Sequence, residues 1–261
     1  MSSMKTQFGA ASLRGARERN EDAWDIDIEC GVFVVSDGIG GGVHGDIASR
    51  TACTAVIDAA RKLLQQEMPI DIEYLFEEAN NAVDQTAHWL HAADEMGATL
   101  LVAYLDKQNN RACIAWAGDS VAYILKKRKG LILLTSPHRL NVTSNTLTSN
   151  IGCNLNQRAQ IIETPIEPGD CLLLCTDGVW EVLEEDLILN MIQDEVNAPW
   201  LAELLVRTAV DAAGRYSDNA TALVLIIDDE HCSSEGNTST PTDACTSTDG
   251  SITPRYSIIE I

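Results

Sequence analysis

Short apolar runs bounded by glycine or polar residues recur along the chain and predict strands. Seven segments have this pattern: Gly31 to Val35, Thr99 to Leu105, Arg111 to Ala117, Val121 to Leu125, Leu131 to Leu134, Cys171 to Cys175 and Thr221 to Ile227. Several connections between them, such as Asp106 to Asn110, are only a few residues long. Because such short connections suit antiparallel hairpins rather than helical crossovers, we expect a largely antiparallel sheet.

Longer segments place apolar residues three or four positions apart and predict helices. They are Asp46 to Gln66, Asp71 to Ala93, Glu184 to Val196 and Pro199 to Ala213. Pro69 separates the first two, and Gly214 follows the last. Strands in runs and helices in pairs indicate a layered fold of the α+β class.

The length of 261 residues suffices for one large domain, which we place at residues 1–228. From about Asp229 the composition changes to Ser, Thr, Gly, Asp and Pro, which cannot bury enough apolar surface to order the chain. We therefore expect residues 229–261 to form a disordered tail. Its last residues, Ser257 to Ile261, are interpreted as a frayed end, with a docking peptide or an added strand as the alternative.

A net charge of −21 and a pI near 4.4 disfavour a nucleic-acid partner. The basic run Lys126 to Lys129 is interpreted as a solvated turn that Gly130 helps to reverse. No segment approaches the roughly 18 apolar residues of a membrane span, and Met1 to Arg19 lacks the pattern of a signal peptide. We expect no membrane contact and a cytoplasmic location.

The eight cysteines contain no CxxC pair, and several lie inside apolar runs. Cysteine in such a run acts as a small hydrophobic residue. We therefore interpret them as reduced, structural thiols, in preference to a zinc site or a secreted disulfide framework.

Five short motifs place an aspartate beside small or turn-forming residues near the ends of predicted strands. They are Asn20-Glu21-Asp22, Ser36-Asp37-Gly38, Gly118-Asp119-Ser120, Thr176-Asp177-Gly178 and Ser217-Asp218-Asn219. One such motif alone is usually a turn. Strands that end together, however, bring their carboxylates together, and a carboxylate cluster must hold cations or suffer mutual repulsion.

Carboxylate oxygens are hard ligands, so the expected cation is Mg²⁺ or Mn²⁺. Two such ions about 4 Å apart lower the pKa of a bridging water and hold both oxygens of an in-line displacement at phosphorus. The motifs therefore predict hydrolysis of a phosphate ester. Arg17 offers a planar fork for phosphate oxygens, with a surface salt bridge as the alternative.

In their order and spacing these motifs resemble the metal-dependent protein phosphatase family, the type 2C serine/threonine phosphatases. The resemblance runs from Arg17 to Thr221 and also includes Gly97-Ala98-Thr99, Pro168-Gly169-Asp170 and the residues that follow Gly178, Val179-Trp180-Glu181. It implies an αββα sandwich of two antiparallel sheets flanked by helix pairs, with residues 1–228 as the catalytic domain.

The resemblance also implies two metal ions with shared ligands. Asp37 would bridge the ions, and the carbonyl of Gly38 would help to hold one of them. Asp177 and Asp218 would bind the other. Asp119 would serve a third ion, whose presence is left open.

Four further residues receive roles from the resemblance. Glu21 and Asp22 would act largely through metal-bound water. Arg17 would take the phosphate, and Thr99 would pack beneath the site.

Two departures from the family pattern affect the chemistry. Ile39 stands where animal and plant members often have a histidine and bacterial members commonly have an aliphatic residue, so an acid proposed there for the leaving group is absent. His138 is interpreted as a structural turn residue, with a catalytic acid as the alternative, because metal-bound water can deliver the proton. Where bacterial relatives carry a flap with an acidic residue, only Arg139 to Thr146 remain, without a carboxylate. We expect an open cleft that accepts bulky folded substrates.

Taken together, the residues predict a monomeric Mg²⁺- or Mn²⁺-dependent phosphatase that acts on phosphoserine and phosphothreonine in proteins and opposes a Ser/Thr kinase. The alternative is an inactive relative that binds phosphoproteins as a regulatory module. A two-metal nuclease conflicts with the net charge. A P-loop is excluded because Gly38 to Gly42 is not followed by Lys-Ser/Thr, and no Gly-x-Ser-x-Gly elbow supports a serine hydrolase.

Overall fold

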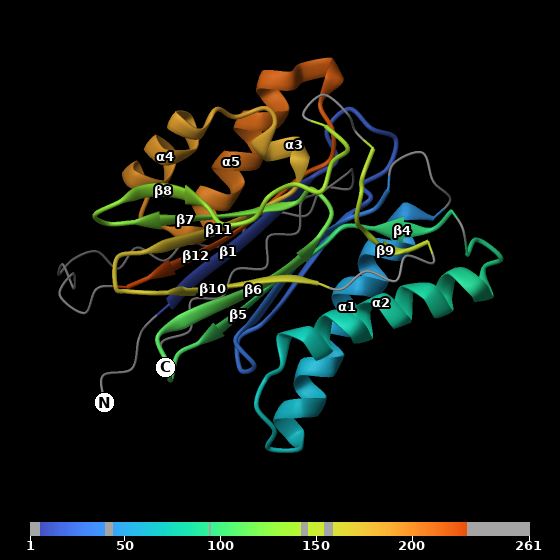
Figure 1. The fold of residues 1–261 in the computed structure, drawn as a ribbon. Helices are drawn as coiled ribbons and strands as arrows, with labels where there is room; N and C mark the ends of the chain where they lie inside the picture. The colour runs from blue at the N-terminus through green and yellow to red at the C-terminus, as the bar shows by residue number, and fades with distance from the viewer. Residues whose placement is uncertain (1–5, 40–43, 94, 142–145, 154–158, 229–261) are drawn as a thin grey trace, which may run out of the picture.

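The computed structural model describes residues 6–39, 44–93, 95–141, 146–153 and 159–228. Two antiparallel sheets pack face to face, and helices cover the outer face of each (Figure 1). This arrangement confirms the predicted αββα sandwich and the α+β class. The predicted tail, 229–261, lies outside the described residues.

Each large sheet has five strands. The first has the order β1 (Thr6–Leu13), β12 (Ala220–Ile227), β11 (Cys171–Cys175), β7 (Val121–Lys126) and β8 (Gly130–Leu133). The second has the order β10 (Gln160–Pro165), β6 (Arg111–Ala117), β5 (Leu100–Asp106), β3 (Val32–Asp37) and β2 (Asp22–Asp27). Every pair is antiparallel, as is the small sheet of β4 (Gly97–Ala98) and β9 (Ile151–Gly152).

The helices lie in two groups (Figure 1). The second sheet carries α1 (Gly45–Gln65) and α2 (Ile72–Trp89), and the first carries α3 (Asp177–Trp180), α4 (Glu185–Asp194), α5 (Ala198–Ala213) and the short 3₁₀ helix η1 (Gly214–Tyr216). The Asp71 side chain caps α2 by accepting from two backbone N–H groups, and the Asn197 side chain caps α5. None of the described helices is long and apolar enough to cross a membrane.

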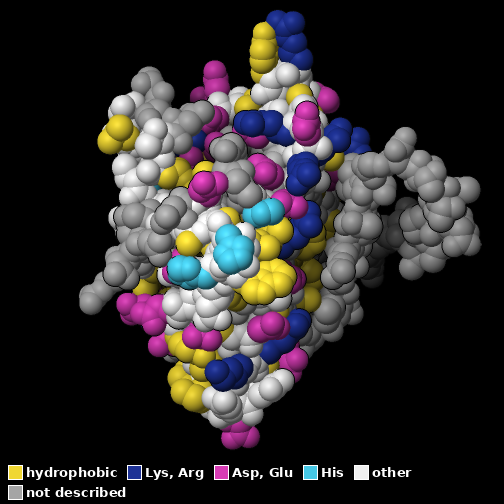
Figure 2. Space-filling model, turned by 90° about the vertical axis from the view of Figure 1, so that its right-hand side faces the viewer, with side chains coloured by type: hydrophobic (Ala, Val, Ile, Leu, Met, Phe, Trp, Pro, Cys, Tyr) yellow, Lys and Arg dark blue, Asp and Glu magenta, His cyan; other side chains and the backbone are white. Residues whose placement is uncertain are grey.

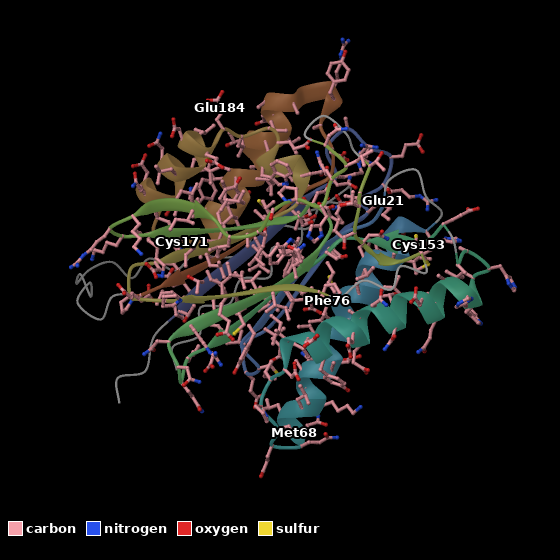
Figure 3. The ribbon with its side chains drawn as sticks, in the orientation of Figure 1. Glu21, Met68, Phe76, Cys153, Cys171 and Glu184 are labelled. Atoms are coloured by element: carbon pink, nitrogen blue, oxygen red, sulfur yellow. The ribbon has the colours of Figure 1, made fainter. Side chains whose placement is uncertain are left out.

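Apolar side chains fill the three spaces between the layers. One cluster joins α1 and α2 to the second sheet, a second lies between the sheets, and a third joins the first sheet to α4 and α5. Figure 3 shows Phe76 on the side of α2 that faces the sheets, where it is buried in the first of these clusters. Alternate residues of β5 enter different clusters, Leu100 toward the helices and Leu101 toward the other sheet, as strand geometry requires.

Three predicted details need correction. The predicted helix over Asp71 to Ala93 is too long, because α2 ends at Trp89. Just beyond that end, His91 adopts a left-handed φ of 58°, and the Ala92 N–H donates to the Ala87 carbonyl, which terminates the helix. The prediction that the basic run is solvated is wrong for Lys126. Its Nζ lies 2.6 Å from Oδ2 of Asp170 in a largely buried ion pair. The predicted strands omit β1, β2 and β10, which are edge strands of the two sheets.

Candidate metal centre

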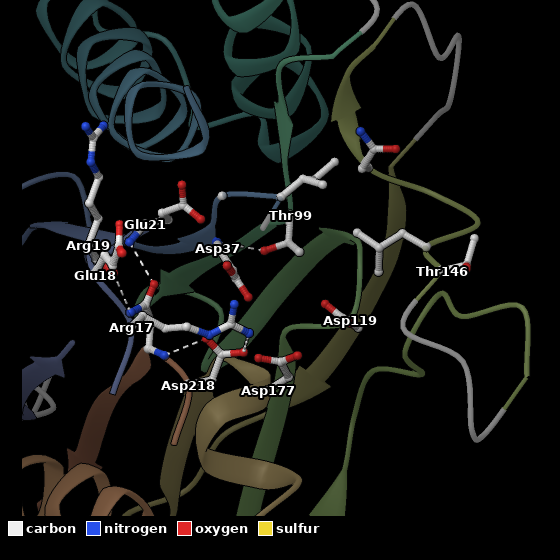
Figure 4. Close-up of a pocket in the computed structure, with 15 residues that line it drawn as sticks. Arg17, Glu18, Arg19, Glu21, Asp37, Thr99, Asp119, Thr146, Asp177 and Asp218 are labelled. Carbon is white, nitrogen blue, oxygen red and sulfur yellow. Dashed lines mark hydrogen bonds and ion pairs between the residues drawn. The ribbon is translucent and has the colours of Figure 1, made fainter. Parts of the chain in front are cut away.

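A cleft of about 630 Å³ lies at one end of the sandwich, and most of the predicted site residues line it (Figure 4). Figure 3 places Glu21 at the same end of the molecule as Cys153, which follows β9. The predicted residues in the cleft wall are Arg17, Glu21, Asp37, Gly38, Asp119, Asp177 and Asp218. Asp22 does not line the cleft and is buried.

Three aspartates from different strand ends converge in this cleft. Asp37 ends β3, Asp119 follows β6, and Asp177 begins α3 directly after β11. One carboxylate oxygen from each lies within 4.8 Å of the others. Strand ends from both sheets thus meet at one edge and bring three of the five motif aspartates into one carboxylate cluster, without Asp22 and Asp218.

The cluster is electrostatically costly without a cation. Burial, followed by the charges of Asp22 and Asp177, raises the pKa of Asp37 well above its ordinary value. Burial and the neighbouring Asp119 raise the pKa of Asp177 to about 8. A bound divalent ion would remove this repulsion and favour the ionised carboxylates.

The backbone of Asp37 is held by a buried polar group beneath the cleft. Its N–H donates to Thr99 Oγ1 at 2.9 Å, and that hydroxyl lies 2.8 Å from Ser120 Oγ in a second hydrogen bond. The Ser36 hydroxyl donates to the Thr99 carbonyl at 2.6 Å. Thr99 therefore packs under the cluster, where the resemblance placed it.

Asp22 lies opposite Asp37 in the pairing of β2 with β3. Its Oδ2 accepts hydrogen bonds from the hydroxyls of Thr176 at 2.9 Å and Thr221 at 2.6 Å. Its Oδ1 is buried and has no hydrogen-bond partner among the described residues. Burial raises the pKa of Asp22 to about 6. An unpartnered buried oxygen beside Asp37 fits a site that takes a cation or its water.

Gly38 and Glu21 lie where β2 and β3 meet the start of α1. The Gly38 N–H donates to the Glu21 carbonyl at 3.1 Å, and a Cβ on Gly38 would lie 2.2 Å from the Gly45 carbonyl oxygen. Only glycine allows the chain to pass this closely. Burial, followed by the charge of Asp46, raises the pKa of Glu21, whose side chain lines the cleft.

Arg17 and Asp218 form an ion pair at the rim, with Nη2 and Oδ2 2.5 Å apart (Figure 4). The Arg17 side chain is 55% exposed, so a ligand in the cleft can reach its guanidinium. Asn219 organises this rim, because its amide donates to the carbonyls of Arg14 and Arg19.

His138 lies away from the cleft lining. Its Nδ1 accepts from the Gly118 N–H at 3.2 Å, and its ring stacks on Trp116 with centroids 5.9 Å apart. This geometry favours the structural turn over the catalytic acid.

The sequence interpretation missed Arg139 as a functional residue. Its guanidinium forms ion pairs with Asp119, Asp177 and Glu181, so a positive charge lies against two members of the carboxylate cluster. The one sign of it in the sequence was a lone arginine in the segment 139–146, which contains no carboxylate.

The face around this end is mixed in charge. Figure 2, which views the molecule from the side of β4 and β9 in Figure 1, shows acidic and basic side chains intermixed on its upper half. Arg17 and Arg19 line the cleft beside the aspartates. An anionic group therefore meets positive side chains at the cleft despite the net charge of −21.

Comparison with known proteins agrees with this geometry. The family model described as protein phosphatase 2C matches residues 11–224. The serine/threonine phosphatase stp of Listeria welshimeri is 25% identical over 234 residues, which cover 82% of this chain and 91% of that protein.

Two solved structures share the fold. The catalytic domain of the phosphatase PstP, in complex with two manganese ions, has a TM-score of 0.73 at 21% identity, covering 87% of this chain and 100% of that one. The phosphatase MsPP of Mycobacterium smegmatis, in complex with cacodylate, has a TM-score of 0.71 at 24% identity, covering 85% and 98%. From the family match over most of its length and from the convergent aspartates, the chain belongs to the protein phosphatase 2C family.

Proposed function

We propose that the chain hydrolyses phosphoserine and phosphothreonine in proteins with two divalent ions, Mg²⁺ or Mn²⁺. The observation that carries this proposal is the convergence of Asp37, Asp119 and Asp177 within 4.8 Å in a cleft that Arg17 also lines. The family match and the named Listeria phosphatase support the reaction class and the type of substrate.

The residues present fit hard divalent cations. Every side-chain donor of the cluster is a carboxylate oxygen, which suits Mg²⁺ or Mn²⁺. Asp37 and the Gly38 carbonyl would hold one ion, and Asp177 and Asp218 the other. The two manganese ions bound by the PstP catalytic domain support this choice of metal.

Glu21 and Asp22 would act largely through water in the site. The unpartnered Oδ1 of Asp22 supports this role, because a water beside it would supply the missing donor. When bound, the ions would lower the pKa of water in the site and supply positive charge to the phosphate.

The remaining steps belong to the chain itself. Arg17 would orient the phosphate with its planar guanidinium while Asp218 limits the directions in which that side chain points. Thr99 and Ser120 hold the Asp37 backbone, which keeps its carboxylate aimed into the cleft. Since Ile39 offers no proton and His138 does not line the cleft, the leaving serine or threonine oxygen would take its proton from water.

We further propose that the protein works as a monomer in the cytoplasm and opposes a Ser/Thr kinase. The cysteines support a reducing compartment, because Cys30, Cys53, Cys113, Cys171 and Cys175 are buried free thiols. All the principal metal positions of the two-ion site are filled, which disfavours an inactive regulatory relative.

The test is hydrolysis of an aryl phosphate and of a phosphothreonine peptide with added Mn²⁺. Asp37→Asn should lower kcat at least about 100-fold, more than the loss of a residue that only supports a ligand. Asp211→Asn, the same charge change at an exposed position of α5, should leave the rate unchanged. Full wild-type activity in EDTA, or no turnover of either substrate, would refute the proposal.

A further inference from the structure

Arg139 places a fixed positive charge on one side of the carboxylate cluster. One of its guanidinium nitrogens lies 2.7 Å from Oδ2 of Asp119, and another contact of 3.0 Å reaches Oδ2 of Asp177. A third ion pair joins it to Glu181. With only 8% of its side chain exposed, Arg139 is an internal cation and not a surface residue.

The surrounding structure holds the guanidinium in this position. Its central carbon lies 5.2 Å from the centre of the Trp180 ring, in cation–π contact. The Trp180 indole N–H donates to the Asp119 carbonyl at 3.0 Å, so the ring and the Asp119 backbone are fixed relative to each other. Arg139 thus has ionic partners and an aromatic ring beside it.

The backbone around Arg139 is equally well defined. The His138 N–H donates to the Gly118 carbonyl at 2.9 Å, and the Thr148 N–H donates to the His138 carbonyl at 2.8 Å. Arg139 itself pairs with Leu147 in an isolated antiparallel bridge. The two ends of the shortened flap segment are therefore tied together and to the strand end that carries Asp119.

The charge balance of the cluster changes when Arg139 is included. Asp119 and Asp177 are two of the three residues whose oxygens come within 4.8 Å. An arginine guanidinium keeps its proton in proteins, so Arg139 brings a full positive charge against both carboxylates. The guanidinium therefore stays charged and neutralises this side of the cluster without any ion.

We propose that Arg139 excludes a divalent ion from the Asp119 side of the cleft, so that Asp119 serves the internal guanidinium in place of a metal. This inference rests on the proposed metal-dependent function, because it concerns how many ions the same cluster takes. A divalent ion at Asp119 Oδ2 would compete with two guanidinium nitrogens, Nε and Nη2 of Arg139, for the same lone pairs and would be repelled by their charge. Asp177 contacts Arg139 only through Oδ2, at the longer distance of 3.0 Å, so its other carboxylate oxygen can serve the ion that it would share with Asp218. Ions would then bind at Asp37, Asp177 and Asp218 and not at Asp119.

The experiment counts bound Mn²⁺ on the purified full chain, by electron paramagnetic resonance of free Mn²⁺ during titration. Arg139→Gln removes the charge and should add one bound ion per chain. The dissociation constant for Mn²⁺ at that additional site should be at least tenfold lower than in the wild type. Asp119→Asn in the Arg139→Gln background should abolish the gain. Arg207→Gln removes an arginine that pairs with Glu203 on α5 and should leave the count unchanged.

A second variant tests the proposal while it keeps the Arg139 side chain. Asp119→Asn alone should leave the number of bound Mn²⁺ ions as in the wild type, because Asp119 already serves the guanidinium. If it loses an ion, the proposal is wrong. It is also wrong if folded Arg139→Gln binds the same number of ions as the wild type, or if that variant changes only the inhibition by inorganic phosphate, which would make Arg139 a phosphate ligand.

The failure of this inference can be told apart from the failure of the proposed function. A wild type that binds no Mn²⁺ and shows no turnover refutes the function itself. A wild type that binds Mn²⁺ and turns over substrate, with an unchanged count in Arg139→Gln, refutes only the role of Arg139.

Discussion

The close passage of Gly38 beside Gly45 makes a sharp prediction about stability. Gly38 is not among the glycines with positive φ, so alanine can adopt its backbone conformation, and the cost of Gly38→Ala is steric. The added Cβ would lie 2.2 Å from the carbonyl oxygen of Gly45, 2.4 Å from the carbonyl carbon and 2.8 Å from the Cα. Carbon–oxygen contacts ordinarily stay near 3.3 Å or more, so the backbone must separate by about 1 Å.

That separation moves the first turn of α1, which is packed on the second sheet through Ala48 and Ala52. Overpacking of this kind costs about 1–3 kcal/mol, and we expect the upper end because backbone meets backbone. For a domain of this size the loss corresponds to a melting temperature lower by about 6–12 °C.

Gly45→Ala is the matched control, because it adds a methyl group on the other side of the same contact. Its Cβ would lie 3.1 Å from the Glu21 carboxylate, the far end of a flexible side chain, and 3.2 Å from the Gly38 carbonyl carbon, and both contacts are much longer than the 2.2 Å contact in Gly38→Ala. A helical alanine is also favoured over glycine by about 0.5–1 kcal/mol, so the net change should stay below about 1 kcal/mol. Urea unfolding in EDTA, followed by circular dichroism, measures both variants. Equal midpoints for Gly38→Ala and Gly45→Ala would refute the steric reasoning.

Three further predictions concern groups beneath the cleft. Thr221→Val removes a donor from the buried Asp22 carboxylate and should lower the free energy of unfolding by about 1–3 kcal/mol in urea titrations. In the folded protein the pKa of Asp22 is raised to about 6 and that of Asp177 to about 8. The stability that these two carboxyl groups contribute is therefore fully present below the pKa of an aspartate in the unfolded chain, and it is lost as the pH rises through about 6 and about 8. Metal-free protein should therefore become less stable as pH rises from about 4 to about 8 in thermal melts, and saturating Mn²⁺ should flatten that dependence. His138→Gln keeps an acceptor for the Gly118 N–H and should change kcat less than about threefold, whereas a general acid would lose about 100-fold or more in steady-state kinetics.

The central strands could be predicted from the sequence because burial on both faces leaves a continuous apolar run. The predicted bounds of β6 and β11 agree with the structure, and both strands lie inside their sheets. The edge strands β2 and β10 carry no such run. β2 reads Asp-Ala-Trp-Asp-Ile-Asp, and β10 is mostly exposed, so their conformation comes from pairing with β3 and β6 and not from local pattern.

The carboxylate cluster could be predicted only in part from local sequence. Strand-end aspartates suggested convergence, but Asp37 belongs to one sheet and Asp177 follows a strand of the other. Whether two sheets align their ends depends on how they pack, which no single strand encodes. The family resemblance supplied that step, and the position of one oxygen from each carboxylate within 4.8 Å of the others agrees with it.

Arg139 shows why the charge balance of the cluster has to count cations from the chain as well as from solution. Clustered carboxylates require a cation, and when only metal ions are considered, a segment between His138 and Leu147 without acidic residues offers no further ligand. In the structure the same shortened segment carries the guanidinium that pairs with Asp119. A segment without carboxylates and an arginine against Asp119 fit together, because this side of the cluster would be under-neutralised unless the segment brought a positive charge of its own.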